Sequence, residues 1–223
     1  MVEPNMATML SFLCTDAAVA PRALQAMLRE VVDQTYNCLT IDGEGSTSDT
    51  VLLLANGKAG NPSLRSARGA SARRFTRALL EVCEDLVRKL ACDGEGATKL
   101  LTVRVEGARN PEQADRAARR IANSLLVKTA VFGGDPNWGR ILQTLGAGRV
   151  DLDEARTEVR LCGVPVFRNG SSAGAAARKR AARGLEEAEV EIHVDLASGR
   201  AAARIFSCDL SYDYVKINAE YTT

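Results

Sequence analysis

A threonine near the start of the chain combines a nucleophilic side chain with a position suited to covalent chemistry. Thr8 follows the small residue Ala7 and the turn-forming pair Pro4-Asn5, and it precedes the apolar residues 9–13, which predict a buried strand. Its hydroxyl would therefore stand where an exposed turn enters a rigid element, within reach of the carbonyl carbon of Ala7. Attack there would cleave the chain and make Thr8 a new N-terminus, whose own α-amine can act as the base for its hydroxyl.

Thr8 also fits a simpler interpretation, because most threonines before a strand are ordinary β-branched strand residues. Few other side chains could form a nucleophile–base pair. His193 is the only histidine, and it lies on the polar face of an expected strand, which indicates a solvated or hydrogen-bonded surface residue. The six cysteines are scattered without a C-x-x-C pair, so they predict buried, reduced thiols of a cytosolic protein and no structural metal site. They are Cys14, Cys38, Cys83, Cys92, Cys162 and Cys208.

A second candidate site residue lies in a glycine-rich turn. The run Asp93-Gly94-Glu95-Gly96 separates an expected helix over residues 71–91 from an expected strand over residues 100–105. Glycines allow a backbone to approach a ligand closely, which would leave Glu95 to contact a polar group of a substrate. The alternative is an ordinary helix C-terminal turn that contains an incidental acid. The polar residues 218–223 predict, on general grounds, a frayed terminus.

The composition argues against several classes of partner. The 223 residues include 29 basic and 28 acidic side chains, a net charge of +1, so the chain lacks the electrostatic footprint of a protein that binds nucleic acid or an anionic membrane. No apolar run approaches the roughly 20 residues of a membrane span, and the N-terminus lacks a basic-then-apolar signal pattern. The five cations between Lys58 and Arg74 predict a solvated loop, because no aromatic side chains are interleaved with them.

Apolar periodicity in the first two thirds of the chain predicts helices that alternate with strands. Helices are expected over residues 21–36, 71–91 and 111–126, the last with Asn110 as its N-cap. Residues 50–55 form a continuous apolar run, which predicts a strand buried on both faces. Asn137 is expected to cap a helix over residues 138–145. The glycine-containing residues 133–140 are therefore interpreted as a scaffold turn, since they match no nucleotide-binding pattern.

The C-terminal third predicts a mixed α+β unit. A hairpin over residues 159–167 should turn at Gly163, and an alanine- and arginine-rich helix should follow over residues 173–188. Alternating residues 190–196 predict a half-buried strand, which is expected to pair with a strand over residues 201–206. A last strand is expected over residues 212–217.

Several long motifs occur in order along the chain and resemble those of one enzyme family. They are Pro4-Asn5-Met6-Ala7-Thr8-Met9-Leu10, Thr15-Asp16-Ala17, Ser46-Thr47-Ser48-Asp49-Thr50-Val51, Asp93-Gly94-Glu95-Gly96-Ala97-Thr98-Lys99, Gly133-Gly134-Asp135-Pro136-Asn137-Trp138-Gly139-Arg140, and the final residues from Cys208 to Thr223. In sequence and order these motifs resemble the ornithine acetyltransferases, the bifunctional glutamate N-acetyltransferases of arginine biosynthesis. The family's D-G-D-T-S-T-N-D pattern appears here at residues 42–49 with three departures, at Glu44, Gly45 and Ser48.

The resemblance implies a mixed α/β (α+β) fold in two domains. Residues 1–98 would form half of a layered α/β/β/α sandwich, and residues 99–223 a smaller C-terminal α+β domain whose tail returns to the active site. Residues 1–7 would be the end of an α chain, and self-cleavage between Ala7 and Thr8 would make Thr8 the first residue of a β chain. The resemblance also implies that Thr8 is the catalytic residue and that Thr8, Glu95, Asn218 and Thr223 contact substrate.

The implied reaction moves an acetyl group from N2-acetylornithine to glutamate through an acetyl-threonine intermediate, in the cytoplasm and without a cofactor or metal. Some relatives also use acetyl-CoA as a co-substrate. The implied partner is the α chain, in an α2β2 heterotetramer. The family's oxyanion-hole Thr-Gly pair and two further substrate contacts belong to that half, so an isolated copy should be nearly inactive and should leave apolar surface uncovered.

Two alternative functions remain open from the sequence. The chain could belong to an N-terminal-threonine amidohydrolase or aminopeptidase, in which water replaces glutamate as the acceptor. It could also be a non-catalytic truncated fragment that lacks the α half. Release of ornithine without glutamate would indicate the hydrolase, and the DNA upstream of Met1 would test the truncated fragment.

Overall fold

The computed structural model describes residues 9–45 and 47–220 of the chain. The fold is mixed α/β, as predicted, and the described residues form two compact units, within Met1–Lys89 and Leu90–Thr223. The expected domain boundary after residue 98 stays a prediction. The two units are defined by contacts within this chain, whereas the predicted boundary refers to the layers of a completed sandwich.

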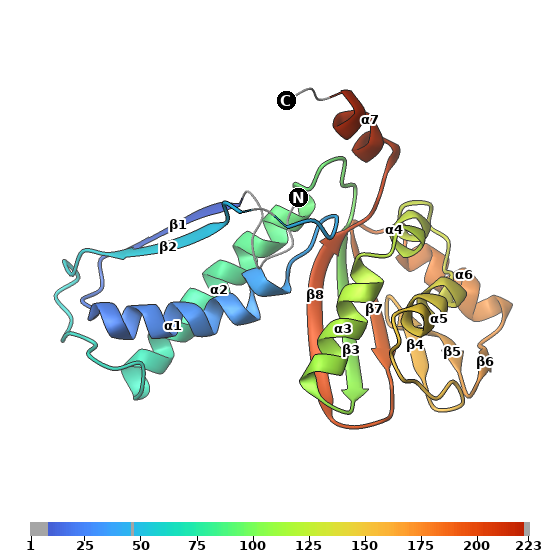
Figure 1. Cartoon of the computed structure of the whole chain (residues 1–223), viewed down its shortest axis with the longest axis horizontal. Helices are drawn as coiled ribbons and strands as arrows, with labels where there is room; N and C mark the ends of the chain where they lie inside the picture. The colour runs from blue at the N-terminus through green and yellow to red at the C-terminus, as the bar shows by residue number, and fades with distance from the viewer. Residues whose placement is uncertain (1–8, 46, 221–223) are drawn as a thin grey trace. The chain divides into compact units, whose positions relative to one another are not determined.

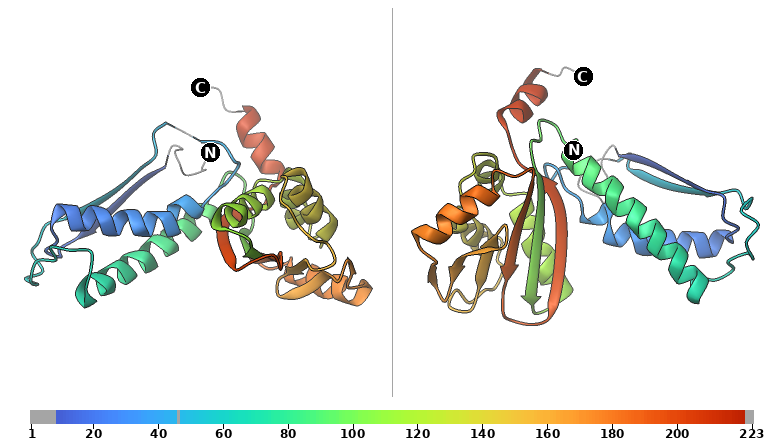
Figure 2. Two further views of the ribbon diagram at one scale, coloured as in Figure 1. Left: turned by 60° about the horizontal axis from the view of Figure 1, so that its bottom comes forward. Right: turned by 180° about the vertical axis from the view of Figure 1, so that it is seen from behind.

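The first unit contains a two-stranded parallel sheet, of β1 (Leu10–Thr15) and β2 (Thr50–Ala55). The helices α1 (Pro21–Gln34) and α2 (Ala70–Cys92) lie on one side of this sheet, as Figures 1 and 2 show. A single 3₁₀ turn, Tyr36–Cys38, follows α1. Helix α1 begins at a proline, whose missing N–H needs no partner in the first turn. Its stripe Met27, Leu28 and Val31 is buried, as the periodicity predicted.

The other face of this small sheet is apolar and exposed. In register, Leu10 lies opposite Thr50 and Phe12 opposite Leu52. The side chains of Leu10, Phe12, Leu52 and Leu54 are 60%, 63%, 43% and 56% exposed, whereas Leu13 on the opposite face is only 6% exposed. The predictions of a buried first strand and of a second strand buried on both faces are therefore wrong for this chain alone. Two strands cannot cover both of their own faces, and a lone pair of strands is marginally stable.

The second unit is built on a six-stranded mixed sheet with the strand order β6-β5-β4-β7-β3-β8. Its strands are β3 (Leu100–Ala108), β4 (Glu158–Leu161), β5 (Val164–Arg168), β6 (Ser171–Ser172), β7 (Glu189–Asp195) and β8 (Ala201–Cys208). The predicted hairpin of β4 and β5 is confirmed, with Cys162 and Gly163 at positive φ in its turn. The predicted pairing of the strands that became β7 and β8 is wrong, because β3 lies between them, parallel to β7 and antiparallel to β8.

Helices of the second unit pack on this sheet through small apolar residues. Helix α3 (Pro111–Ala122) packs against β3 and β8, with Ala114, Ala117 and Ala118 fully buried. Asn110 caps it as predicted, accepting a hydrogen bond from the Gln113 amide at 2.8 Å. The helix ends at residue 122 rather than 126. A second helix, α4 (Leu125–Phe132), starts there because the hydroxyl of Ser124 accepts a hydrogen bond from the Val127 amide. The remaining helices before the tail are α5 (Trp138–Ala147) and α6 (Ala175–Gly184).

The C-terminal segment forms a helix instead of the predicted last strand. Helix α7 spans Tyr212–Glu220, and none of its residues is buried. Its alternating aromatic and aliphatic residues resemble a strand pattern, but no strand edge pairs with them in the described part of the unit. The hydroxyl of Ser211 instead accepts a hydrogen bond from the Asp213 amide at 3.1 Å, which satisfies a free N–H of the first turn. Among residues 9–45 and 47–220, no helix has both the length and the apolar character that a membrane span requires.

Candidate active site

The structure brings together two of the predicted substrate-contacting residues of the second unit. The side-chain amide of Asn218, on α7, donates a hydrogen bond to Oε2 of Glu95 at 3.2 Å, although 123 positions separate the two residues in sequence. Both side chains lie at the surface of the unit, where a ligand can reach them. The other predicted site residues, Ala7, Thr8 and Thr223, lie outside the described residues. Their roles stay predictions.

The glycine after Glu95 is required by the close approach of the tail. Gly96 has a φ of +67°, which L side chains rarely adopt. A Cβ at this position would lie 2.5 Å from the backbone nitrogen of Tyr214 and 2.9 Å from Oγ of Ser211. The hydroxyl of Ser211 donates a hydrogen bond to the Gly96 carbonyl at 2.5 Å. The absence of a side chain on Gly96 therefore allows the backbone of the Glu95 loop to lie against the backbone of α7.

A buried carboxylate fastens the end of the same loop. Asp209 is only 2% exposed. Its Oδ1 accepts hydrogen bonds from the amides of Thr98, at 2.8 Å, and Lys99, at 3.0 Å. Its Oδ2 accepts a short hydrogen bond from the hydroxyl of Thr98. A buried carboxylate with this many donors is well satisfied, and such charge-assisted hydrogen bonds are the stronger ones.

The lysine that ends the loop holds carbonyl groups rather than a ligand. Nζ of Lys99 donates to the carbonyl oxygens of Leu185 at 2.6 Å and Val131 at 2.9 Å, with Phe132 at 3.4 Å. Val131 and Phe132 form the last turn of α4, whose carbonyls lack partners within the helix. A cation is favoured at such a helix C-terminus. Lys99 therefore anchors the Glu95 loop to two neighbouring elements.

In the first unit, the first described residue is Met9, which directly follows the predicted nucleophile Thr8. Met9 is covalently bonded to Thr8 and is only 5% exposed. Its amide donates a short hydrogen bond to Oδ1 of Asp49, and its carbonyl accepts one from the Thr50 amide at 2.8 Å. Oδ2 of Asp49 is buried without a hydrogen-bond partner among the described residues. Burial raises the pKa of Asp49, an effect that the Met9 amide opposes.

The buried thiol of this unit is not an activated nucleophile. Burial raises the pKa of Cys83 to about 11, so almost none of it is thiolate near neutral pH. Burial also raises the pKa of Tyr36, whose hydroxyl lies 2.6 Å from Oγ of Ser11. The six cysteines, all among the described residues, form no disulfide bond. The prediction that they are buried is confirmed for Cys83 and Cys208. It is wrong for Cys14 and Cys92, which are exposed, and Cys38 and Cys162 are only half-buried.

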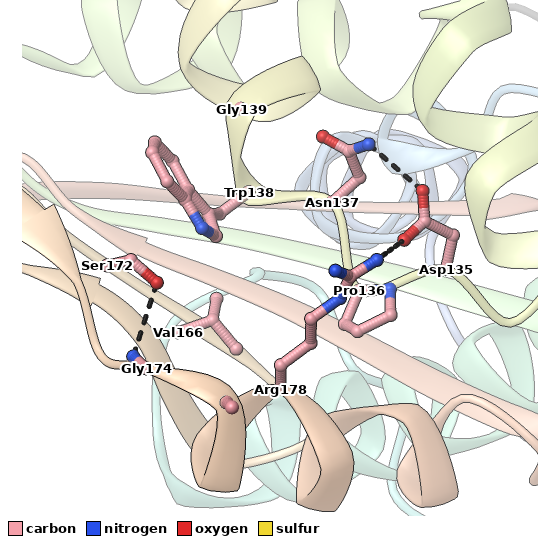
Figure 3. A pocket seen from close by; sticks show the side chains of 10 residues that line it. Asp135, Pro136, Asn137, Trp138, Gly139, Val166, Ser172, Gly174 and Arg178 are labelled. Carbon is pink, nitrogen blue, oxygen red and sulfur yellow. Dashed lines mark hydrogen bonds and ion pairs between the residues drawn. The ribbon is translucent and has the colours of Figure 1, made fainter.

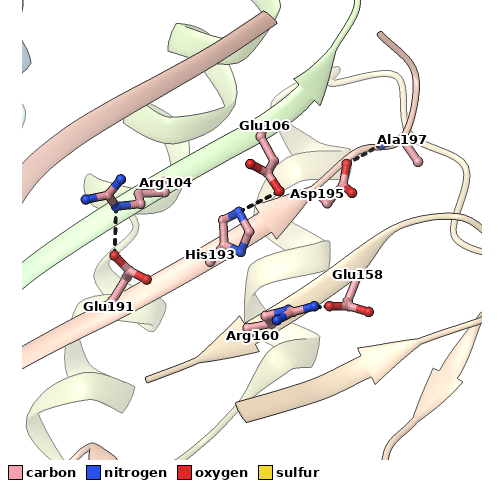
Figure 4. A network of polar contacts seen from close by, with 8 residues as sticks. All are labelled: Arg104, Glu106, Glu158, Arg160, Glu191, His193, Asp195 and Ala197. Carbon is pink, nitrogen blue, oxygen red and sulfur yellow. Dashed lines mark hydrogen bonds and ion pairs between the residues drawn. The ribbon is translucent and has the colours of Figure 1, made fainter. Parts of the chain in front are cut away.

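The only histidine belongs to a row of charged pairs on the larger sheet (Figure 4). Nε2 of His193 lies 3.1 Å from Oε1 of Glu106 on the neighbouring strand. Arg104 pairs with Glu191 at 2.7 Å beside it. This environment confirms the prediction of a hydrogen-bonded surface histidine, and Figure 4 shows no hydroxyl or thiol among the drawn partners.

Residues 135–139 of the 133–140 motif line a separate cavity of about 440 Å³ in the second unit. Figure 3 shows the Trp138 ring above Val166, with Arg178 extended toward Asp135, at 3.3 Å. Asn137 caps α5 through a hydrogen bond from the Arg140 amide at 3.1 Å, as predicted. The Trp138 ring also packs on Phe167, with 4.8 Å between centroids. These contacts hold α5, α6 and the β5 region together, which agrees with the interpretation of the motif as a scaffold.

Sequence reasoning missed Asp49, Asp209 and Ser211, which form hydrogen bonds with residues close in sequence to the predicted site residues. A buried acid directly after an apolar strand, as in Cys208-Asp209, was the signal available for one of them. Their hydrogen-bond partners lie up to 115 positions away, however, so periodicity could not reveal them. In the described ranges, no group of three or more His, Cys, Asp and Glu side chains is arranged to hold a metal ion.

Comparisons with known proteins place the whole chain in one family. The ArgJ family model matches residues 1–223. The chain is 49% identical over 225 residues to a glutamate N-acetyltransferase from Methanopyrus kandleri, and 45% identical over 223 residues to the arginine biosynthesis bifunctional protein ArgJ of Bacillus subtilis. Each match covers 100% of this chain but only 57% and 54% of those proteins, so the chain spans about half the length of the curated relatives. The crystal structure of ArgJ from Bacillus halodurans is similar with a TM-score of 0.89 and 39% identity, over 96% of this chain and 100% of that one.

Proposed function

The chain belongs to the ArgJ family, and from that premise we propose that it is the nucleophile-bearing half of a cytoplasmic acetyltransferase of arginine biosynthesis. The reaction would move an acetyl group from N2-acetylornithine to glutamate. The observation that carries this proposal is the match over the whole chain to proteins named for glutamate acetylation and arginine biosynthesis. The substrates and the mechanism below are part of the proposal.

The proposed reaction starts with the hydroxyl of Thr8. After cleavage of the Ala7–Thr8 bond, the neutral α-amine of Thr8 takes the hydroxyl proton, and Oγ attacks the acetyl carbonyl of N2-acetylornithine. The C–N bond of the acetamide breaks, and ornithine leaves with the proton on its amine. The neutral amine of glutamate then attacks the ester carbonyl, the C–O bond to Thr8 Oγ breaks, and the proton lost by the amine returns to Oγ through the α-amine of Thr8 as N-acetylglutamate leaves. A terminal amine has a pKa of about 7.7–8.0, which suits a base near neutral pH.

The contact between Asp49 and Met9 fixes the backbone of the residue that directly follows Thr8. The Met9 amide donates a hydrogen bond to Oδ1 of Asp49. Among the described residues, Oδ2 of Asp49 has no hydrogen-bond partner. Asp49 is also the last acid of the 42–49 pattern, and the departures in that pattern leave it unchanged.

The extent of one solved relative supports cleavage into two polypeptides. The curated relatives are nearly twice as long, yet the solved Bacillus halodurans chain is matched over 100% of its length by this chain. A chain of this extent therefore exists as a separate polypeptide in that structure. We propose that the amino-terminal half supplies the oxyanion-binding groups and the remaining substrate contacts, in an α2β2 assembly. No cofactor is proposed, although acetyl-CoA is a candidate second acetyl donor.

The test assembles this chain with an amino-terminal half, encoded upstream of it or taken from the Methanopyrus kandleri relative. The complex is mixed with N2-acetylornithine, with and without glutamate, and the peptide that starts at Thr8 is analysed by mass spectrometry. We expect one acetyl group on Thr8 and ornithine release that depends on glutamate. The Thr8→Ala variant should lose at least about a thousandfold in turnover, and Thr8→Ser should retain part of it.

Three outcomes would contradict the proposal in different ways. Ornithine release at the same rate without glutamate would indicate the hydrolase alternative. Turnover by the Thr8→Ala variant would eliminate the threonine nucleophile. An assembled complex without any turnover, and a gene without an in-frame upstream half, would favour the non-catalytic fragment.

A further inference from the structure

We propose that Asp209 and Ser211 are positioning residues, which fasten the first turn of helix α7 to the Glu95 loop so that Glu95 and Asn218 act as one recognition pair. The inference rests on the proposed function in treating this pair as a substrate contact. It goes beyond that function in assigning roles to two residues that act through the placement of Glu95 and Asn218.

The first fastening is the carboxylate of Asp209. It accepts hydrogen bonds from two consecutive backbone amides, of Thr98 and Lys99, and from the hydroxyl of Thr98. These contacts fix the end of the Glu95 loop to the residue that directly follows β8. An asparagine has the same shape, but its NH₂ group would face donors in place of an acceptor oxygen.

The second fastening is the hydroxyl of Ser211, which bridges the loop and the helix. It donates to the Gly96 carbonyl at 2.5 Å and accepts from the Asp213 amide at 3.1 Å. One side chain thus joins the residue after Glu95 to the first turn of α7. The absence of a side chain on Gly96 allows the Tyr214 backbone to lie against it.

These contacts bear on where Asn218 lies, because they hold the first turn of α7 against the Glu95 loop. The helix has nine residues, none of them buried, and helices this short are marginal in water without tertiary contacts. A further attachment is the edge-on contact between the rings of Tyr212 and Phe132, with centroids 5.6 Å apart. Asn218 lies one turn after Tyr214, whose carbonyl it also contacts at 3.0 Å. Fixing the first turn of α7 therefore presents the Asn218 amide to Glu95.

The experiment compares Ser211→Ala with a matched control that removes a similar hydrogen bond elsewhere in the same unit. In Ser198→Ala the lost hydroxyl donates to the Gly107 carbonyl at 3.0 Å, in the connection between β7 and β8. The first measurement is hydrogen exchange of the amides of residues 212–220 in this chain. We expect Ser211→Ala to accelerate exchange there at least about fivefold, the size expected for the loss of one of the two hydrogen bonds that this hydroxyl makes. Ser198→Ala should leave exchange in α7 unchanged, and Ser211→Thr, which keeps a hydroxyl, should restore protection.

The second measurement is steady-state kinetics of the chain assembled with its amino-terminal half. We expect Ser211→Ala to raise KM for N2-acetylornithine about fivefold with kcat unchanged, because ground-state and transition-state binding weaken alike. Ser211→Thr should restore KM, and Ser198→Ala should not change it. Asp209→Asn should act in the same direction and more strongly. Ser211→Ala keeps the test decisive if the aspartate variant fails to fold.

The outcomes separate this inference from the proposed function. Unchanged exchange in α7 of the Ser211→Ala variant overturns the fastening. Faster exchange with an unchanged KM overturns the recognition role of the pair, as does an equal KM change in the Ser198→Ala control. If the wild-type assembly transfers no acetyl group, the proposed function and the recognition role fail together, and the exchange data decide whether the fastening stands.

Discussion

The two sheets of this chain present very different uncovered faces. On the first unit, the open face of β1 and β2 consists of Leu10, Phe12, Leu52 and Leu54. On the second unit, the strands carry paired charges instead, such as Arg104 with Glu191 at 2.7 Å and 52% and 42% side-chain exposure (Figure 4). Charged pairs on a sheet are compatible with water, whereas contiguous exposed apolar side chains mark an interaction surface. The comparison indicates that the sheet of the second unit needs no further cover on this face, whereas the exposed face of the first sheet has the character of an interaction surface.

The largest expected difference is in the free energy of unfolding lost when one leucine of each sheet is truncated. Leu101 on β3 is fully buried, whereas Leu52 on β2 is 43% exposed. Leu101→Ala should lower the free energy of unfolding by about 2–5 kcal/mol, as in other buried leucine truncations. Leu52→Ala should lower it by less than about 1 kcal/mol in this chain, because little burial is lost. Urea unfolding of both variants measures the two values.

The destabilisation caused by the same two variants can also be measured in a complex with the amino-terminal half. If that half covers the open face, Leu52→Ala should become markedly more destabilising in the complex, while the effect of Leu101→Ala should not change. An equal effect of Leu52→Ala in both states would show that the partner does not cover β2.

A glycine pair provides the next test, because both residues have a positive φ but only one is crowded. Gly96 in the second unit has a φ of +67°, and a Cβ added there would meet backbone atoms within 3 Å. Gly60 in the first unit has a φ of +72°, and an added Cβ would meet nothing within 4 Å. Gly60→Ala should destabilise by about 1–2 kcal/mol through the backbone conformation alone. Gly96→Ala should carry the same backbone cost and a further cost of about 1–3 kcal/mol for overpacking. Equal unfolding free energies would contradict the described approach of α7.

The open apolar face predicts self-association of the chain at high concentration. Replacing Phe12, which is 63% exposed, with lysine should reduce the weight-average mass in sedimentation velocity experiments. Arg104→Ser is the matched change on the charged face and should leave the mass unchanged. A monomeric wild-type chain at all concentrations, or a larger effect of Arg104→Ser, would refute the assigned roles of the two faces.

The smallest expected effects concern thiols of the first unit. Cys14 is exposed on the open sheet face, while burial raises the pKa of Cys83 from 9.0 to about 11. At pH 8, alkylation should therefore label Cys14 much faster than Cys83. The raised pKa of Cys83 also makes the free energy of unfolding depend on pH, because the folded state favours the neutral thiol. That contribution is fully present below the unfolded pKa near 9 and is lost as pH rises through about 11.

Replacing Cys83 with alanine should therefore make the unfolding free energy less dependent on pH between about 9 and 11. Denaturant unfolding at several pH values measures this, with Cys14→Ala as the exposed control. An identical pH dependence in wild type and the Cys83→Ala variant would contradict the burial of this thiol in solution.

Local sequence signals predicted most helices and their caps correctly. Asn110 and Asn137 each accept the hydrogen bond expected of an N-cap, and the turn at Gly163 forms the predicted hairpin. These features depend on residues within about four positions of one another, so their chemistry is visible in the sequence. The same holds for His193, whose place on the polar face of an alternating strand predicted its environment.

The errors arose where a distant partner decides the structure. The alternation in residues 212–217 predicts a strand, but a strand needs a sheet edge, and the segment forms α7 once Ser211 caps it. The strand after Ser198 pairs with β3 rather than β7, because a short connection can cross over a neighbouring strand. Apolar runs predicted burial of β1 and β2, but could not show that one face of these strands stays exposed in this chain.

By itself, the sequence determined the mixed α/β class, the family and the residue types available for chemistry, since each is encoded in local patterns and long motifs. Only the tertiary structure decided that Glu95 meets Asn218 across 123 positions and that Asp209 and Ser211 hold the segments carrying them. The physical reason is that hydrogen bonds and close backbone contacts are satisfied in space, by groups whose separation along the chain leaves no periodic trace.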